Sequence, residues 1–439
     1  MKVLKFGGTS VGSAERIRKV AGIVTGKGKN IVVLSAMAGT TNTLVEISDY
    51  LYKKNVNGAH DIANALELKY LETIGCLYDK EATKAAATAA IKERFDYLRL
   101  LAKANFTVLE EKEILAQGEM MSTAMMHLYL QEQGVKSVLL PALEYMRTDS
   151  NGEPDTAFVK ARLSEMLDEH RDADIYITQG YICKNAYGET DNLQRGGSDY
   201  SASLIGAAVG AEEIEIWTDI DGMHNNDPRY VENTRPVERL NFEEAAELAY
   251  FGAKILHPTC VQPAKLNNIP VRLLSTLDPS AKGTLIDNMA ADHTIKAVAA
   301  KDGITAIRVK SSRMLLAYGF MSKVFEIFEA HKTPIDMVTV SEVGVSVTVD
   351  NERNLESIIA ELRKFGTVTI DHDMVIICVV GDLEWQNRGF EAKALAALKD
   401  IPVRMISYGG SNCNISFLIR KEDKVAALAK LSENLFNKQ

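Results

Sequence analysis

Apolar positions in the first three hundred residues fall into two alternating kinds of segment. Short continuous apolar runs are typical of strands that are buried on both faces, and longer stretches between them have the period of amphipathic helices. The runs that we interpret as strands are Val3–Phe6, Ile31–Ser35, Ile175–Thr178, Ile214–Thr218 and Val271–Leu274. Alternation of this kind predicts an α/β fold, in which a mostly parallel sheet is sandwiched by helices.

The segments between these strands predict the helices. Ser13–Thr25, Ser198–Val209 and Phe242–Phe251 have helical patterns. The Ala- and Lys-rich segment Asp61–Lys103 contains no strand-like run, and we interpret it as a helical subdomain inserted into the sheet scheme. We expect these elements to form one domain over residues 1–292.

An internal repeat follows this domain. Three landmarks recur 68 to 70 residues apart (402 − 334, 377 − 307 and 389 − 319): Ile307–Val309 with Ile377–Val379, Gly319–Phe320 with Gly389–Phe390, and Pro334–Met337 with Pro402–Met405. Each copy has the order strand, helix, strand, strand, helix. A repeat of this period indicates duplicated supersecondary units, and a βαββαβ order is ferredoxin-like. We expect two such units, at residues 300–373 and 374–439.

Composition and charge narrow the classes of function. The chain is 46% hydrophobic and 25% charged, which is ordinary for a globular protein, and its net charge of -9 argues against a nucleic-acid partner. The five cysteines are scattered without a CxxC pair, as in proteins of a reducing compartment. No apolar run approaches the ~20 residues that span a bilayer, and the amino terminus lacks the apolar core of a signal peptide. We expect a cytoplasmic protein without a membrane partner.

Glycine-containing turns are the candidate anion sites, because the sequence has no Walker A motif, no GxGxxG and no HExxH. In Lys5-Phe6-Gly7-Gly8-Thr9-Ser10, an ammonium group at a strand end stands beside glycines that let backbone N–H groups approach a phosphate. The alternative is a solvated lysine before a tight turn.

Two further glycine-containing turns are candidates. Arg195-Gly196-Gly197-Ser198-Asp199 enters a helix, and its arginine could bind a carboxylate or phosphate in a bidentate manner, although Ser198 or Asp199 could equally be a simple N-cap. Trp217–Gly222, followed by Asp227–Arg229, lies after a strand, where ligands bind in open α/β sheets. An Asp-Gly turn alone occurs in any fold.

Taken together, these segments resemble the aspartokinase branch of the amino acid kinase family. The motifs that carry the resemblance occur in the family's order over nearly the whole chain: KFGGTSV at Lys5–Val11, SAMAGTTN at Ser35–Asn42, QGE at Gln117–Glu119, RGGSDYSA at Arg195–Ala202, WTDIDG at Trp217–Gly222 and FGAKILHP at Phe251–Pro258. The repeats resemble the family's paired ACT domains.

The resemblance implies a set of site residues. Lys5 and Asp199 would be catalytic, Lys5 contacting the transferring phosphoryl group. The amino acid L-aspartate would be held by Thr41, Glu119, Arg195 and Ser198, with Glu119 taking its ammonium group. ATP would be bound by Lys5, Gly7, Gly8, Thr218, Asp219, His224, Arg229, Lys254 and Ile255.

The reaction that the resemblance implies is phosphorylation of the aspartate β-carboxylate, the first step towards lysine, threonine and methionine. This nucleophile is already ionised at neutral pH, so no general base is needed. The site must bring two anions together and spread the charge of a loose phosphoryl transition state. We expect Mg²⁺ to enter on ATP, with no protein metal site.

The sequence departs from the family in two loops. A glycine is usual at Gln194 and threonines are usual near Asp191 and Asn192, so the substrate loop is expected to be arranged differently. A tyrosine is usual at His224, which changes the expected contacts of the purine or ribose.

The repeats are most similar to those of the lysine-sensitive class. The residues that would line an effector pocket are Met314, Gly319, Phe320, Met321, Asp336, Ser341 and Glu342. Ala317 replaces a serine that is common in that class, which weakens the assignment of lysine, and apolar residues such as Phe320 could equally serve helix packing. Because ACT units pair across two-fold axes, we expect a homodimer or a dimer of dimers.

Two other functions stay open on the sequence. A kinase for glutamate or an acylated amino acid is one, although Glu119 would have no ammonium group to meet on an acylated amine. A non-catalytic amino-acid sensor is the other. We do not expect a bifunctional kinase–dehydrogenase, because no dinucleotide fingerprint follows the repeats.

Overall fold

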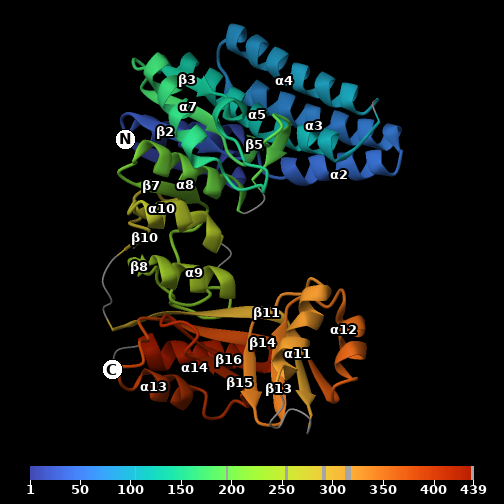
Figure 1. The fold of residues 1–439 in the computed structure, drawn as a ribbon. Helices are drawn as coiled ribbons and strands as arrows, with labels where there is room; N and C mark the ends of the chain where they lie inside the picture. Colours follow the sequence, from blue (N-terminus) through green and yellow to red (C-terminus); the bar gives the residue numbers. More distant parts are fainter. Residues whose placement is uncertain (104, 194–195, 253–255, 289–292, 312–317, 437–439) are drawn as a thin grey trace. The chain divides into compact units, whose positions relative to one another are not determined.

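The computed structural model describes residues 1–103, 105–193, 196–252, 256–288, 293–311 and 318–436 (Figure 1). The chain divides into two units. The first comprises Met1–Met223, Glu238–Phe242 and Ile255–Asn288, and the second comprises His224–Val237, Glu243–Lys254 and Met289–Gln439.

An eight-stranded sheet forms the centre of the first unit, in the order β3-β4-β2-β1-β7-β9-β10-β8. Its strands are β1 (Lys2–Phe6), β2 (Asn30–Leu34), β3 (Ser137–Leu140), β4 (Ile175–Gln179), β7 (Ile214–Thr218), β8 (Arg239–Asn241), β9 (Val271–Ser275) and β10 (Thr284–Asp287). Every neighbouring pair is parallel except β9 and β10. The predicted mostly parallel sheet is therefore confirmed, and the five strands expected from apolar runs are all present.

Helices cover both faces of this sheet. They are α1 (Ala14–Thr25), α2 (Thr40–Tyr52), α3 (Val56–Leu77), α4 (Glu81–Leu101), α5 (Val108–Glu132), α6 (Ala142–Tyr145), α7 (Thr156–Glu169), α8 (Gly197–Val209) and α10 (Gln262–Leu266). Leu4 and Phe6 of β1 join one buried cluster with Ile17 of α1 and Met121 of α5. Because side chains alternate along a strand, Lys5 faces the other side, where α8 lies.

Two local features of the first unit were not expected from the sequence. Helix α5 is buried on almost all sides around Ile114–Met126, so it lacks the polar stripe that reveals a helix. Strands β5 (Ile182–Lys184) and β6 (Thr190–Asn192) form a short antiparallel hairpin that immediately precedes the segment leading into α8.

A six-stranded antiparallel sheet forms the second unit, in the order β12-β13-β11-β14-β16-β15. Its strands are β11 (Ile295–Lys310), β12 (Val338–Ser341), β13 (Gly344–Val349), β14 (Thr367–Gly381), β15 (Met405–Tyr408) and β16 (Asn414–Arg420). Its helices are α11 (Phe320–Ala330), α12 (Leu355–Leu362), α13 (Phe390–Ala397) and α14 (Lys424–Phe436), and α9 (Phe242–Phe251) belongs to it from Glu243 onwards.

The two long strands of this sheet are shared between two ferredoxin-like units. The second half of β11 lies between β13 and the first half of β14, and the first half of β11 pairs with the second half of β14. The strand order is then β14-β11-β13-β12 in one unit and β11-β14-β16-β15 in the other, which is the same order of edge and centre strands. The predicted ferredoxin-like units are confirmed, and residues preceding the first unit supply the last strand of the second.

The repeat seen in the sequence has a structural cause. Gly319 and Gly389 both stand at the N-cap of a helix, with φ angles of 78° and 89° that favour glycine.

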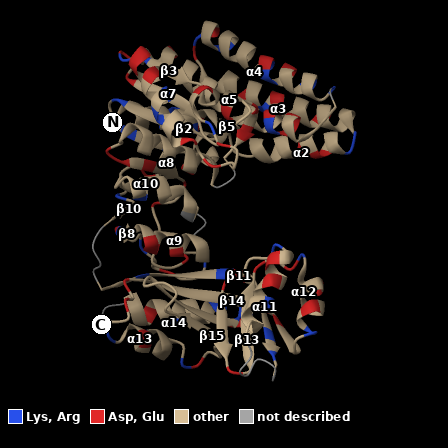
Figure 2. Cartoon of the chain, viewed as in Figure 1, with Lys and Arg blue, Asp and Glu red and all other residues tan. Residues whose placement is uncertain are grey.

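Among the described residues, charges of both signs are interspersed along the helices of each unit (Figure 2).

Candidate active site

An ion pair links the central strand of the first sheet to helix α8. Lys5 Nζ lies 2.6 Å from Asp199 Oδ1, and the two side chains are 12% and 15% exposed. Asp199 is in the first turn of α8, where a negative charge is stabilised by the helix dipole. The ammonium group is therefore held in place at the end of β1 and remains accessible to a ligand.

The Gly7–Gly8 turn packs against two neighbouring strand ends. The N–H of Gly7 donates to the carbonyl of Trp217 over 3.3 Å, and the carbonyl of Gly8 accepts from the N–H of Ala38 over 3.0 Å. A Cβ at Gly8 would lie 2.6 Å from the carbonyl oxygen of Ala36, which real side chains do not tolerate. Glycine is required here because the backbones of the β1 and β2 loops approach each other so closely.

The beginning of α8 is built around a second pair of glycines. Gly196 and Gly197 have φ angles of 72° and 54°, and a Cβ at Gly196 would collide with the Cys260 thiol. The next residue, Ser198, accepts a hydrogen bond from the hydroxyl of Ser35 over 2.9 Å. The positive end of the helix dipole at this terminus favours an anion at the same end of the sheet as Lys5.

Glu119 is a buried carboxylate with unused bonding capacity. Its side chain comes from α5, and its Oε1 accepts from the N–H of Ala36 over 3.1 Å. Its Oε2 is buried and has no hydrogen-bond partner among the described residues. Burial raises the pKa of Glu119 to about 7, against hydrogen bonds that act to lower it. A cationic ligand group placed at Oε2 would satisfy the oxygen and restore the charge.

Short contacts connect these groups to one another. Ala36, which binds Glu119, is also the residue that packs on Gly8, and the hydroxyl of Ser122 donates to the carbonyl of Ser35. Thr41 is the second residue of α2, the helix that follows this segment, and it is half-buried. The structure thus brings together Lys5, Gly7, Gly8, Glu119, Ser198 and Asp199.

The predicted nucleotide residues divide between the units. Thr218 ends β7, where its hydroxyl donates to Asp219 over 3.0 Å and its carbonyl accepts from Thr276 at the end of β9. His224 and Arg229 belong to the second unit. His224 Nδ1 lies 2.9 Å from the Thr234 hydroxyl, and the Arg229 side chain, 74% exposed, forms an ion pair with Asp227. Gln194, Arg195, Lys254 and Ile255 lie outside the described residues.

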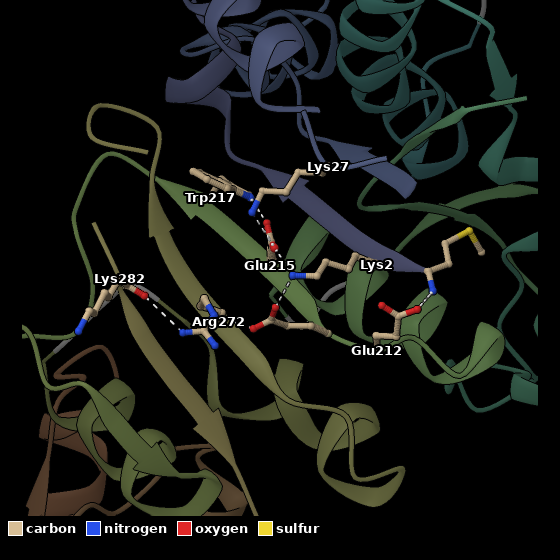
Figure 3. Close-up of polar contacts among 9 residues, drawn as sticks. Lys2, Lys27, Glu212, Glu215, Trp217, Arg272 and Lys282 are labelled. Carbon is tan, nitrogen blue, oxygen red and sulfur yellow. Dashed lines mark hydrogen bonds and ion pairs between the residues drawn. The ribbon is translucent and has the colours of Figure 1, made fainter. Parts of the chain in front are cut away.

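A buried charge network supports the same strands from their other end (Figure 3). Glu215 of β7 is 1% exposed and pairs with Lys2 over 2.9 Å and with Lys27 over 3.0 Å. It also accepts from the Trp217 indole N–H over 3.0 Å, and this indole stacks on Phe6. The network fixes the two residues that immediately precede Gly7 and Thr218.

The predicted effector residues have varied surroundings in the second unit. Phe320 is buried in the apolar core and Met321 packs against it. Ser341, the last residue of β12, and Glu342, in the turn that follows, are exposed. Asp336 Oδ1 lies 2.6 Å from Lys301 Nζ and 2.5 Å from the Tyr250 hydroxyl. Its Oδ2 is buried without a hydrogen-bond partner among the described residues. Met314 and Ala317 lie outside the described residues.

Several residues of the site were missed by reasoning from the sequence. Ser35 and Ala36 lie in the SAMAGTTN motif but were given no role there, because a hydroxyl contact and a backbone N–H contact cannot be read from the motif. A Cβ atom at Gly180 would lie 2.4 Å from the side chain of Ser198, so this glycine lets α8 approach the end of β4. The signal that was available is the Gln179-Gly180 pair at the end of a predicted strand.

Among the described residues, no group of three or more His, Cys, Asp or Glu side chains is arranged to hold a metal ion. None of the described helices is both long and apolar enough to cross a membrane.

Comparisons with known proteins agree with this geometry. The model of the amino acid kinase family matches residues 1–275, and a model of the ACT domain matches residues 377–435. Lysine-sensitive aspartokinase 3 of Escherichia coli is 32% identical over 99% of this chain and 99% of its own length. The chloroplastic aspartokinase 1 of Arabidopsis thaliana is 33% identical over 99% of this chain and 80% of its own length.

Solved structures give the same result. The E. coli aspartokinase III complex with aspartate and ADP, in the R-state, superposes over 100% of both chains with a TM-score of 0.84 at 32% identity. The complex of that enzyme with lysine and aspartate, in the T-state, has a TM-score of 0.83. The chain therefore belongs to the amino acid kinase family, in its aspartokinase branch.

Proposed function

We propose that this protein catalyses the ATP-dependent phosphorylation of the β-carboxylate of L-aspartate, which yields 4-phospho-L-aspartate. The observation that carries the proposal is the juxtaposition of two complementary sites. Lys5 beside the tightly packed Gly7–Gly8 turn suits a phosphate, and a buried carboxylate with an unpaired oxygen suits an ammonium group. Gly8 and Glu119 both contact Ala36. The similarity to an enzyme solved with aspartate and ADP supports the choice of substrates.

The residue roles follow from the chemistry of the groups. Glu119 accepts hydrogen bonds from the ammonium group of the substrate. Ser198, Thr41 and Arg195 bind the substrate carboxylates. Lys5 neutralises charge on the transferred phosphoryl group, while Asp199 orients Lys5 through the ion pair. Because the acceptor carboxylate is already ionised, the residues act by positioning and by charge stabilisation.

ATP is proposed to bind along Gly7, Gly8, Thr218 and Asp219, with His224, Arg229, Lys254 and Ile255 as further contacts. Mg²⁺ enters as part of the MgATP substrate and balances charge on the phosphates. Asp199, which pairs with Lys5, would accept hydrogen bonds from waters bound to this Mg²⁺, and such an ion needs few protein ligands.

Feedback inhibition by lysine is proposed for the ACT units. The buried and unpaired Oδ2 of Asp336 suits an effector amino group, and the relative solved with lysine supports this ligand class. Gly319, Met321, Ser341, Glu342, Met314 and Phe320 remain predicted members of that pocket. Domain limits at 1–292, 300–373 and 374–439, assembly through the ACT units, cytoplasmic location and the absence of nucleic-acid and membrane partners also remain predictions.

A substrate panel tests the proposed activity. ADP release would be followed in a coupled assay with aspartate, glutamate and N-acetylglutamate as acceptors, for the wild type and for Lys5→Ala. We expect turnover with aspartate and a loss of about 10²- to 10³-fold in kcat in the variant. Preference for glutamate or N-acetylglutamate would refute the substrate, and a wild-type rate in Lys5→Ala would refute the site.

A further inference from the structure

An ion pair that belongs to neither substrate site connects α5 to the β5–β6 hairpin. Lys112 Nζ lies 2.7 Å from Asp191 Oδ1, and the side chains are 21% and 18% exposed. Lys112 precedes Glu119 by seven residues on α5, which places both on one face of the helix. Helix α5, which carries Glu119, is therefore also bound to the β5–β6 hairpin through Lys112.

The hairpin is connected in turn to helix α8. Just beyond β6, the N–H of Leu193 donates to the carbonyl of Tyr181 over 2.7 Å. The N–H of Tyr181 donates to the hydroxyl of Ser201 on α8 over 2.8 Å. Tyr181 has a φ angle of 67°, and a non-glycine residue keeps such a conformation only where its surroundings impose it.

Asp191 also carries a negative charge that acts on Tyr181, the residue that is hydrogen-bonded to α8. Burial, followed by the charges of Glu119 and Asp191, raises the pKa of Tyr181 to about 12, so this ring lies within the field of both carboxylates. A site for a dicarboxylate is weakened by an unpaired anion nearby, and Lys112 neutralises this one. Asp191 stands at one of the positions where the sequence departs from its family.

We propose that the Lys112–Asp191 ion pair is a positioning device that seats the β5–β6 hairpin on α5 and thereby sets the affinity for the amino-acid substrate. The inference rests on the proposed function. The pair acts through Leu193 and Tyr181 on Ser201 of α8. Among the described residues, the pair has no hydrogen bond or ion pair with Lys5, Gly7 or Gly8, so we expect its effect to fall on aspartate and not on ATP.

The test compares full-length variants in steady-state kinetics and in thermal unfolding with and without aspartate. The variants are Lys112→Met, Asp191→Asn and the charge reversal Lys112→Asp with Asp191→Lys. The control is Arg272→Met, which breaks an ion pair of similar burial with Glu213. Arg272 Nε lies 2.6 Å from Glu213 Oε1, at the amino-terminal ends of β9 and β7.

We expect each single variant to raise KM for aspartate about two- to tenfold, with kcat and KM for ATP within about twofold of the wild type. The charge reversal should bring KM for aspartate most of the way back to the wild-type value. The control should lower the melting temperature without changing KM for aspartate. Unchanged KM values in the single variants, or an equal rise in the control, would overturn the inference.

Thermal unfolding separates this inference from the proposed function. The shift in melting temperature caused by aspartate measures binding without turnover. A wild type that binds aspartate but releases no ADP would refute the proposed reaction, and the ranking of the shifts would still test the ion pair. Equal shifts in the wild type and in all four variants would overturn the positioning role.

Discussion

Replacing Glu119 with glutamine should stabilise the free protein at alkaline pH and weaken aspartate binding. Burial raises the pKa of Glu119 to about 7 from an ordinary value of 4.5. The folded state therefore binds more protons than the unfolded state between these values, so stability falls as the pH rises through this window and then levels off. The shift corresponds to a cost of about 3 kcal/mol above pH ~8.

Glutamine removes this charge but introduces another cost. Its carbonyl can keep the hydrogen bond from Ala36, whereas its NH₂ group occupies the place of the unpaired Oε2 and would lack an acceptor, at about 1–2 kcal/mol. The net gain in the free energy of unfolding is then about 1–2 kcal/mol at pH ~8.5. It shrinks by about 2 kcal/mol at pH ~5.5, where much of the wild-type carboxyl is already protonated.

The effect on binding has the opposite sign. Loss of a charge-assisted hydrogen bond to the substrate ammonium group should raise KM for aspartate about 10- to 100-fold. In the wild type, KM should rise about tenfold from pH ~8 to pH ~6 as Glu119 becomes protonated, and in Glu119→Gln it should be nearly flat.

Urea unfolding and aspartate kinetics over this pH range measure both effects. Glu113→Gln, on the same helix, serves as the matched control and should change neither quantity appreciably. A variant that is less stable than the wild type at pH ~8.5, or that keeps the wild-type KM, would refute the reasoning about the buried oxygen.

Three further predictions concern other parts of the chain. Gly8→Ala places a Cβ 2.6 Å from the Ala36 carbonyl oxygen, so it should lower the free energy of unfolding by about 1–3 kcal/mol and raise KM for ATP. The control Gly22→Ala in α1, which has open space around its Cβ, should change neither quantity. Equal melting temperatures and equal KM values for the two variants would contradict the close approach. Glu215→Gln leaves Lys2 and Lys27 without their buried partner and should lower the free energy of unfolding by about 1–3 kcal/mol with kcat unchanged, and a loss of kcat alone would assign Glu215 a different role. Lys301→Met removes the ammonium group that pairs with Asp336, so Asp336 becomes available to the amino group of a lysine effector. The half-inhibitory lysine concentration should therefore fall severalfold. Unchanged inhibition would show that Asp336 does not belong to the effector pocket.

The sequence predicted those elements whose patterns are local. Buried parallel strands appear as apolar runs, and the glycine pairs at Gly7–Gly8 and Gly196–Gly197 stand where backbones approach closely or φ is positive. The two ferredoxin-like units were visible as a repeat because each copy needs the same glycine before its first helix.

Features that depend on tertiary contacts could not be predicted. The exchange of half-strands between β11 and β14 arises from long-range pairing, which periodicity does not encode. Helix α5 is buried nearly all round, so its pattern lacks a polar face. Glu119 was assigned by resemblance, but its unpaired oxygen and its raised pKa follow only from the packing around it.

The central claim is that the β-carboxylate of aspartate receives the γ-phosphoryl group of ATP at the Lys5–Asp199 end of the sheet. ³¹P NMR of a reaction with MgATP and aspartate tests it directly, because an acyl phosphate has a resonance distinct from inorganic phosphate. We predict an acyl-phosphate signal that hydroxylamine removes and that is absent with Lys5→Ala. Release of inorganic phosphate alone by the wild type, or an undiminished acyl-phosphate signal from Lys5→Ala, would contradict the account.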